Sequence, residues 1–278
     1  MWSDLGRPPL REASLRRGLL APDGDYARID VVGSTGSTNA DLAAAARSGA
    51  PDRTVLIAEH QSAGRGRNTR AWLAPPRAGL SLSVLLRPEG VPGNRWGWLP
   101  LLVGVAVADA VSAAAEIPTA LKWPNDLLVN GRKCAGILAE VADAGAFVVG
   151  IGLNVTQRPD ELPPDADATS LAIEAAACTD RDPLLRAVLR ELAVLDRRWR
   201  DHAGDPDATG LRDAYRARCA TLGRRVDVRL PGDVTLVGEA ADIDEYGRLQ
   251  VRDEHGEEHR VAAGDVIHVR GVTGAAPA

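Results

Sequence analysis

Two lysines stand out in a chain that otherwise carries its positive charge on arginine. Lys122 and Lys133 are the only lysines among 33 basic residues. An ammonium group is a compact point charge, whereas a guanidinium is a planar fork with fixed donor directions. A lysine kept where arginine is the default indicates a site that uses a compact ammonium donor.

Lys122 opens the segment Lys122-Trp-Pro-Asn-Asp126. Pro124 stiffens the backbone and Trp123 can anchor it in the core, which would hold the polar side chains in fixed directions. A strand-to-turn junction with a buried tryptophan explains Trp123 and Pro124, but not the three polar groups ahead of a hairpin. Lys133 either faces the same ligand as Lys122 or is an exposed residue after an Asn-Gly turn.

A cationic loop precedes these lysines. Residues 60–88 contain five arginines and neither Asp nor Glu, although the whole chain has a net charge of −5. In Gln61-Ser-Ala-Gly-Arg-Gly-Arg-Asn68, the glycines let backbone N–H groups approach a carboxylate or phosphate. A flexible solvated loop is the alternative. The loop lacks the Gly-Lys-Ser/Thr ending of a P-loop and the glycine spacing of a dinucleotide fingerprint.

Two further segments are candidate ligand contacts, one through hydroxyl side chains and the other through glycine backbone. Residues 33–39 are dense in hydroxyls ahead of a helix, and capping needs only one of them. Residues 150–154 carry two glycines, which indicate close approach of a backbone or a ligand. No Ser-His-Asp or Cys-His arrangement is evident. Cys134 is interpreted as a packing residue, and three distant cysteines predict neither a disulfide framework nor a metal site.

Alternating and helical patterns predict an α/β mixture ahead of residue 222. Asn130-Gly131 predicts a two-residue hairpin turn, and Ser37 or Thr38 is expected to cap the following helix. The predicted helices span 14–20, 39–48, 95–115, 182–202 and 207–220, and the predicted strands span 29–32, 54–58, 80–86, 127–129, 134–141 and 146–155.

The composition changes at residue 222, where five short strand-like runs begin. They predict a small β-barrel of about 50 residues. Its eleven acidic residues against seven arginines disfavour nucleic-acid binding. The expected division is an arm (1–25), a main domain (26–221), the barrel (222–271) and a tail (272–278). No signal peptide is expected, the apolar run 96–115 favours a buried helix over a membrane span, and the cysteines favour the cytoplasm.

Taken in order, these segments resemble the biotin protein ligase family, in its monofunctional bacterial form. The matching pieces are Gly-Ser-Thr-Asn (36–39), Ala-Glu-His-Gln-Ser-Ala-Gly-Arg-Gly-Arg (58–67) with Trp72, Lys-Trp-Pro-Asn-Asp (122–126), Lys-Cys-Ala-Gly-Ile-Leu-Ala-Glu (133–140) and Gly-Ile-Gly-Leu-Asn-Val (150–155). The resemblance covers about residues 28–270, including the barrel. Each motif is modest in specificity, but the ordered set is highly specific.

The resemblance implies an α+β fold. A mixed, largely antiparallel sheet flanked by helices, similar to class II aminoacyl-tRNA synthetases, is expected, followed by an SH3-like barrel. It also implies a two-step reaction with biotin, ATP and Mg²⁺. The biotin carboxylate attacks the α-phosphorus to give biotinoyl-5′-AMP and pyrophosphate, and a carrier-domain lysine then takes the biotinoyl group. No enzyme nucleophile is needed, so catalysis rests on positioning and charge stabilisation.

Site residues carry over from the resemblance by position. Lys133, Arg67, Asp126 and Lys122 are the expected catalytic residues, with Asp126 orienting or deprotonating the acceptor amine. Mg²⁺ is expected to arrive with ATP, near Asn125, without a fixed protein site. The expected biotin contacts are Ser37, Thr38, Asn39, Gln61, Arg65, Gly66, Arg67, Trp72, Lys133, Gly136 and Leu138. The expected contacts of ATP and the adenylate are Arg67, Lys122, Asn125, Lys133, Gly152 and Asn154.

The expected partner is a biotin carboxyl carrier domain of an acyl-CoA carboxylase or pyruvate carboxylase. Only about 35 residues precede Ser37, too few for the repressor domain of many bacterial relatives. DNA binding is therefore not expected. Asn68-Thr69 departs from the Arg-Gly or His-Gly of the family, which puts loop closure in question. A lipoate–protein ligase or related octanoyl transferase on the same fold and a non-enzymatic biotin or nucleotide sensor are the alternatives, but the sensor needs a DNA-reading element.

Overall fold

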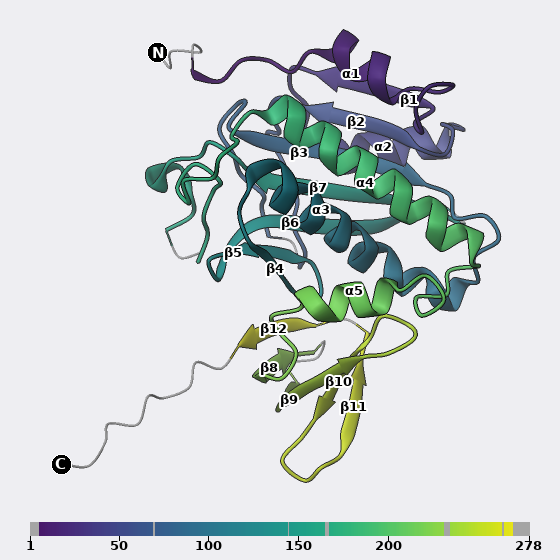
Figure 1. Ribbon diagram of the computed structural model, residues 1–278, viewed down its shortest axis with the longest axis vertical. Coiled ribbons are helices and arrows are strands. Elements are labelled where there is room, and N and C mark those ends of the chain that lie inside the picture. Colours follow the sequence, from purple (N-terminus) through teal and green to yellow (C-terminus); the bar gives the residue numbers. More distant parts are fainter. Residues whose placement is uncertain are drawn as a thin grey trace.

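A seven-stranded mixed sheet forms the centre of the computed structural model (Figure 1). The structure describes residues 6–68, 70–143, 145–164, 167–230, 234–262 and 264–268, so the predicted tail, the start of the arm and Thr69 lie outside it. β1 and β2 run parallel, and the other neighbours run antiparallel. The strands, in sheet order, are β1 (Arg28–Val32), β2 (Thr54–Ala58), β3 (Gly79–Leu86), β7 (Ala146–Asn154), β6 (Arg132–Asp143), β5 (Asp126–Val129) and β4 (Thr119–Lys122).

Helices cover both faces of this sheet, as the alternation of apolar side chains requires. Val84 and Val149 belong to the large core that contains α3 (Leu99–Ala115) and α4 (Arg181–Asp201). Their neighbours Leu85 and Val148 pack in a second core with α2 (Thr38–Arg47). Consequently, α2 lies on the opposite face from α3 and α4. The short helix α1 (Glu12–Leu19) lies beside β1 and α4.

The predicted helix 95–115 has two parts. A 3₁₀ turn spans Gly93–Trp98, and α3 follows with Pro100 in its first turn, where proline removes no helical hydrogen bond. The stretch Gly93–Ala115 is long and apolar enough to cross a membrane, but most of it is buried in the core. The burial agrees with the interpretation as a core helix.

Most of the predicted elements are confirmed, with two exceptions. Asn130 and Gly131 adopt φ values of 48° and 77°, as a tight primed hairpin turn between β5 and β6 requires. The predicted helix 207–220 is wrong in extent: α5 covers only Leu211–Arg218, after a series of turns capped by Asp205. β4 (Thr119–Lys122) was not predicted, because its four residues include one β-branched residue and no aromatic one.

The C-terminal segment forms a five-stranded antiparallel sheet, whose buried apolar residues belong to one cluster with the core of the main domain. Val226, Val228, Ile243, Leu249 and Val251 are fully buried there. This agrees with the predicted small barrel. Its strands, in sheet order, are β11 (Glu258–Val261), β10 (Leu249–Arg252), β9 (Thr235–Ile243), β8 (Arg225–Arg229) and β12 (Asp265–His268).

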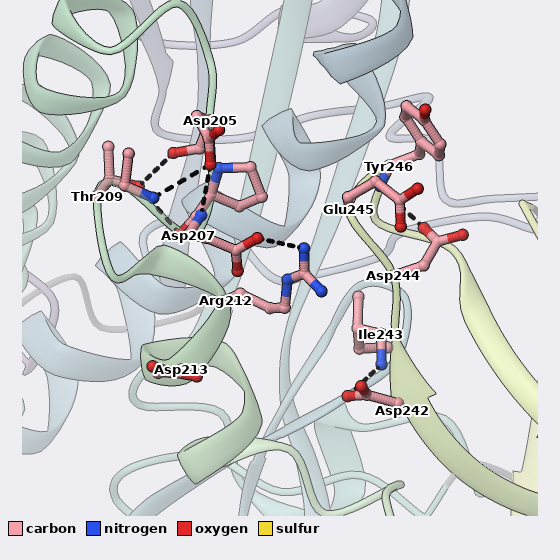
Figure 2. Close-up of polar contacts among 12 residues, drawn as sticks. Asp205, Asp207, Thr209, Arg212, Asp213, Asp242, Ile243, Asp244, Glu245 and Tyr246 are labelled. Atoms are coloured by element: carbon pink, nitrogen blue, oxygen red, sulfur yellow. Dashed lines mark hydrogen bonds and ion pairs between the residues drawn. The ribbon is translucent and has the colours of Figure 1, made fainter.

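The turn between β9 and β10 attaches this sheet to the main domain. Figure 2 shows the turn, in which the backbone N–H of Tyr246 donates to Asp244, close to the loop that precedes α5. Trp98 Nε1 donates to Glu245 O at 3.0 Å, and Trp123 Nε1 donates to Gly247 O at 3.3 Å. Trp123 therefore anchors its segment against the barrel, as well as in the core.

Candidate active site

A cavity of about 470 Å³ opens on the α2 face of the sheet, between the cationic loop and the barrel. Its size is typical of small-molecule sites. Every site residue expected from the sequence lines it: Ser37, Thr38, Asn39, Gln61, Arg65, Gly66, Arg67, Trp72, Lys122, Asn125, Asp126, Lys133, Gly136, Leu138, Gly152 and Asn154.

The start of α2 presents polar groups to the cavity, although not through the predicted cap. Ser37 occupies the cap position, but neither it nor Thr38 makes a capping side-chain bond. Gln61 satisfies the helix end instead: its Oε1 accepts from Thr38 N at 2.8 Å and from Thr38 Oγ1 at 3.0 Å. A residue that follows another strand thus supplies the missing acceptor. The arrangement fixes Gln61 and Thr38 relative to each other.

Asn39 joins α2 to the sheet beneath it. Its Nδ2 donates to Leu138 O at 3.1 Å and to Glu140 Oε2 at 2.7 Å. Its Oδ1 lies 2.6 Å from the hydroxyl of Ser83. A Cβ at Gly150 would come within 2.3 Å of that Oδ1, so this position needs a bare backbone. A close approach is therefore found at Gly150, but the neighbour is the Asn39 side chain and not the backbone or ligand that was predicted.

Two glycines form a flat floor for the cavity. Gly136 on β6 and Gly152 on β7 are directly paired, and Trp72 of the loop lies over both. A Cβ would come within 3.2 Å of the Trp72 ring at Gly136 and within 2.3 Å at Gly152. Real Cβ atoms do not approach a neighbour as closely as 2.3 Å, so the indole requires glycine at position 152. At position 136 the indole would have to move slightly to accept a side chain.

Lys133 and Asp126 form an ion pair across β5 and β6. Lys133 Nζ lies 2.6 Å from Asp126 Oδ1 and 5.9 Å from the centre of the Trp72 ring. Lys122 is the register partner of Asp126 on β4. The two lysines of the chain thus flank one carboxylate, and Lys133 faces the cavity rather than bulk solvent.

The cationic loop is folded over the cavity as a small hairpin. Gly64 O accepts from Trp72 N at 2.8 Å, and Arg70 O accepts from Gly66 N at 2.7 Å. Arg65 is paired with Glu140 on the sheet, and Arg67 donates to Asn125 Oδ1 at 3.3 Å. Arg67 also donates to Gly264 O of the barrel at 3.2 Å.

The amide of Asn154 is occupied by internal hydrogen bonds. Its Nδ2 donates to Thr169 O at 2.9 Å, and its Oδ1 accepts from Gln157 Nε2 at 3.0 Å. Asn154 therefore shapes the end of β7 and the segment that follows it. Nearby, burial raises the pKa of the Cys134 thiol to about 12, which agrees with a packing role.

The charge lining the cavity is strongly positive for an acidic protein. Arg65, Arg67, Arg70, Lys122, Lys133 and Arg229 line it, and Asp126 is the only carboxylate among the lining residues that the structure describes. Such a site favours an anionic ligand. A divalent cation finds no set of carboxylates here, so it would enter with a ligand's phosphates, with oxygens of Asp126 or Asn125 as the nearest supplement.

The sequence reasoning missed the residues that reach the cavity from the barrel and from beneath α2. Arg229, Val266 and Ile267 line the cavity from β8 and β12. Ser83 supports Thr38 and Asn39 from β3. The alternation of Ser81 and Ser83 within an apolar strand was a usable signal for Ser83. No local signal marks the barrel residues, because their place depends on how the two sheets pack.

His268, on β12, contacts the segment that carries Lys122. Its Nε2 lies 3.0 Å from Thr221 Oγ1, which accepts from Trp123 N at 3.1 Å. Burial, with a smaller contribution from the charges of Lys122 and Arg224, lowers the pKa of His268 to about 4. A neutral imidazole can accept a hydrogen bond from the Thr221 hydroxyl. The hydrogen bonds from Trp123 to Thr221 and from Thr221 to His268 then connect the barrel to the segment that carries Lys122.

Comparison with known proteins points to one family. Residues 33–156 match the "Biotin/lipoate A/B protein ligase family", and residues 221–269 match the "Biotin protein ligase C terminal domain". A biotin--[acetyl-CoA-carboxylase] ligase of Mycobacterium tuberculosis is 50% identical over 268 residues, which cover 95% of this chain and 97% of the relative. A bifunctional ligase/repressor BirA of Bacillus spizizenii is 34% identical over 233 residues, covering 82% and 69%.

A solved structure shares the fold. Biotin protein ligase from Aquifex aeolicus, in complex with biotin and ATP, superposes with a TM-score of 0.74 and 28% identity. The likeness covers 88% of this chain and 100% of that one. The expected α+β sheet flanked by helices, with an SH3-like C-terminal domain, is thereby confirmed.

Proposed function

Because the chain belongs to the biotin protein ligase family, we propose that it activates biotin with ATP and transfers it to a carboxylase carrier domain. The activated species is biotinoyl-5′-AMP, and the acceptor is a lysine side chain. The single observation that carries the proposal is the cavity itself, where all sixteen expected residues meet. They come from five separate segments, so their convergence is not a consequence of sequence proximity.

Activation joins two anionic groups, and the cavity is built for that approach. A carboxylate oxygen of biotin attacks the α-phosphorus of ATP, and the bond from that phosphorus to the pyrophosphate oxygen breaks. Lys133, Lys122 and Arg67 offset the repulsion between the groups and the charge that develops on the phosphate oxygens. Gln61 and the start of α2 hold the ureido end, while Trp72, which rests on Gly136 and Gly152, forms a wall beside the rings.

Transfer needs a neutral amine at the anhydride carbon. The acceptor lysine attacks the biotinoyl carbonyl, AMP leaves, and the amine loses a proton. Asp126 is the only carboxylate among the described lining residues, and it is the candidate to orient that amine or take its proton. Its partner Lys133 then stays close to the departing phosphate. The loop over the cavity excludes water, which would otherwise hydrolyse the anhydride.

Several finer expectations accompany the proposal. Mg²⁺ enters with ATP and neutralises part of the phosphate charge, while Asn125 and Asp126 supply at most supplementary oxygens. Acyl-CoA carboxylase is the expected acceptor, with pyruvate carboxylase as a further one. The protein acts in the cytoplasm, and neither DNA nor a membrane is a partner.

The test is pyrophosphate release from ATP and Mg²⁺ without any acceptor, with biotin or lipoate added separately. Release with biotin alone, followed by labelling of an added carrier domain, is the expected result. Release with lipoate alone would place the protein among lipoate ligases. Tight biotin binding without any release would favour a sensor.

A further inference from the structure

No step of the reaction above uses the side chain of Arg65, and the resemblance implies that its backbone is what meets biotin. The side chain is 47% exposed, and its Nη2 lies 3.0 Å from Glu140 Oε2 on the sheet. Glu140 is on β6 and pairs with Val148, two register positions beyond Leu138. It is not among the described residues that line the cavity.

Glu140 makes a second contact through the same oxygen. Asn39 Nδ2 donates to Oε2 at 2.7 Å, and Asn39 is 4% exposed. One carboxylate oxygen thus joins the loop to the buried start of α2. On the barrel side of the cavity, Arg67 holds the loop to Asn125 and Gly264. Asn125 lines the cavity, whereas the partner of Arg65 is Glu140, which lies outside the described lining.

We propose that Glu140 is a positioning residue that latches the cationic loop over the cavity through Arg65, and so sets how long the adenylate is retained. The inference rests on the proposed function, because it assumes that the cavity holds biotinoyl-5′-AMP. Breaking the latch changes how often the loop opens. It leaves Lys133, Lys122 and Arg67 in place, so formation of the adenylate continues.

The experiment separates formation from retention. Biotin, ATP and Mg²⁺ are mixed with the full chain and inorganic pyrophosphatase, without an acceptor, and phosphate is followed in time. The burst reports the first adenylation, and the steady phase reports loss of adenylate from the cavity. Glu140→Gln keeps an oxygen for Asn39 but removes the charge that pairs with Arg65. We expect an unchanged burst and a steady phase faster by roughly 2- to 5-fold, the range of an exposed ion pair.

A double variant and a matched control sharpen the result. Arg65→Gln alone should speed the steady phase to the same extent, because it removes the other half of the pair, and the double variant Arg65→Gln/Glu140→Gln should be no faster than either single variant. Glu258→Gln removes a comparable exposed pair with Arg252 on the barrel, and should change neither phase. The latch is overturned if Glu140→Gln retains the wild-type steady phase, if the double variant is faster than both single variants, or if Glu258→Gln has the same effect. Absence of a burst in the wild type would instead overturn the proposed function.

Discussion

Lys133 and Asp126 contact each other at 2.6 Å inside a cavity where six cationic side chains meet this single described carboxylate. The pair holds the ammonium group at the cavity wall without a substrate. When a carboxylate or phosphate enters, the ammonium can be shared between Asp126 and the ligand without leaving the site. The ion pair therefore preorganises the cation that activation requires.

Lys133→Ala should abolish adenylate formation while the fold survives. The lost cation faces the reacting anions, and removal of one such group costs about 100-fold or more in rate. Pyrophosphate release in the burst assay measures the effect, and a thermal melt monitors the fold. Lys133→Arg should not restore the rate, because a planar fork does not replace a compact ammonium group. Normal adenylate synthesis by Lys133→Ala would contradict the assignment.

Asp126→Ala should slow transfer more than activation. The substitution removes the group expected to orient or deprotonate the acceptor amine, an effect on the order of 100-fold. It leaves Lys133 without its partner but still in the cavity, so activation should fall much less. Single-turnover transfer from preformed adenylate to a carrier domain, compared with the burst rate, separates the two steps. Equal losses in both steps would reject this role.

Gly152→Ala should displace Trp72 from the floor of the cavity. The new methyl group would lie 2.3 Å from the indole, and such overpacking costs typically about 1–3 kcal/mol. We expect weaker biotin binding and a changed tryptophan emission spectrum. Gly33→Ala is the matched control, because a Cβ there meets nothing within 4 Å. Wild-type binding by Gly152→Ala would show that the indole is not part of the biotin site.

His268→Gln should reduce the acid sensitivity of the fold. In the folded chain the pKa of His268 is lowered to about 4, whereas the unfolded chain binds the proton near the ordinary value of about 6.5. The unfolded state binds more protons between these values, so the free energy of unfolding falls as the pH drops from about 6.5 to 4. For this half-buried group the loss is on the order of 1 kcal/mol after solvent screening.

Urea unfolding at pH 7 and pH 5 measures that loss in both proteins. Glutamine keeps an acceptor for Thr221 but does not titrate, so the difference between the two pH values should shrink. A difference as large as that of the wild type would locate the acid sensitivity elsewhere.

Local patterns predicted the elements that carry their own signal. The Asn130-Gly131 turn, the apolar α3 and the amphipathic α4 all follow from periodicity and turn chemistry. β4 lacks such a signal because its four residues include one β-branched residue and no aromatic one. At the start of α2, Ser37 holds the predicted cap position, but the predicted capping bond is absent, and the acceptor comes from Gln61, 23 residues from Thr38. Tertiary contacts override local capping preference at this point.

The candidate site was predictable as a set of residues, but not as an arrangement. The ordered motifs identified Lys122 and Lys133, yet nothing in their spacing indicates that Asp126 lies between them. Glu140 stood within a recognised motif without a function, because its partners Arg65 and Asn39 are 75 and 101 residues distant. Arg229 reaches the cavity only through the packing of the barrel.

The paired glycines let the Trp72 indole rest directly on the main chain of β6 and β7. Hydrogen-bonded main chain has no rotamers, so this surface is already ordered before a ligand binds. The entropy lost on binding then falls on the loop that carries Arg65, Arg67 and Trp72. Affinity for the ligand should accordingly vary with the stiffness of that loop more than with any change to the sheet that leaves both glycines in place.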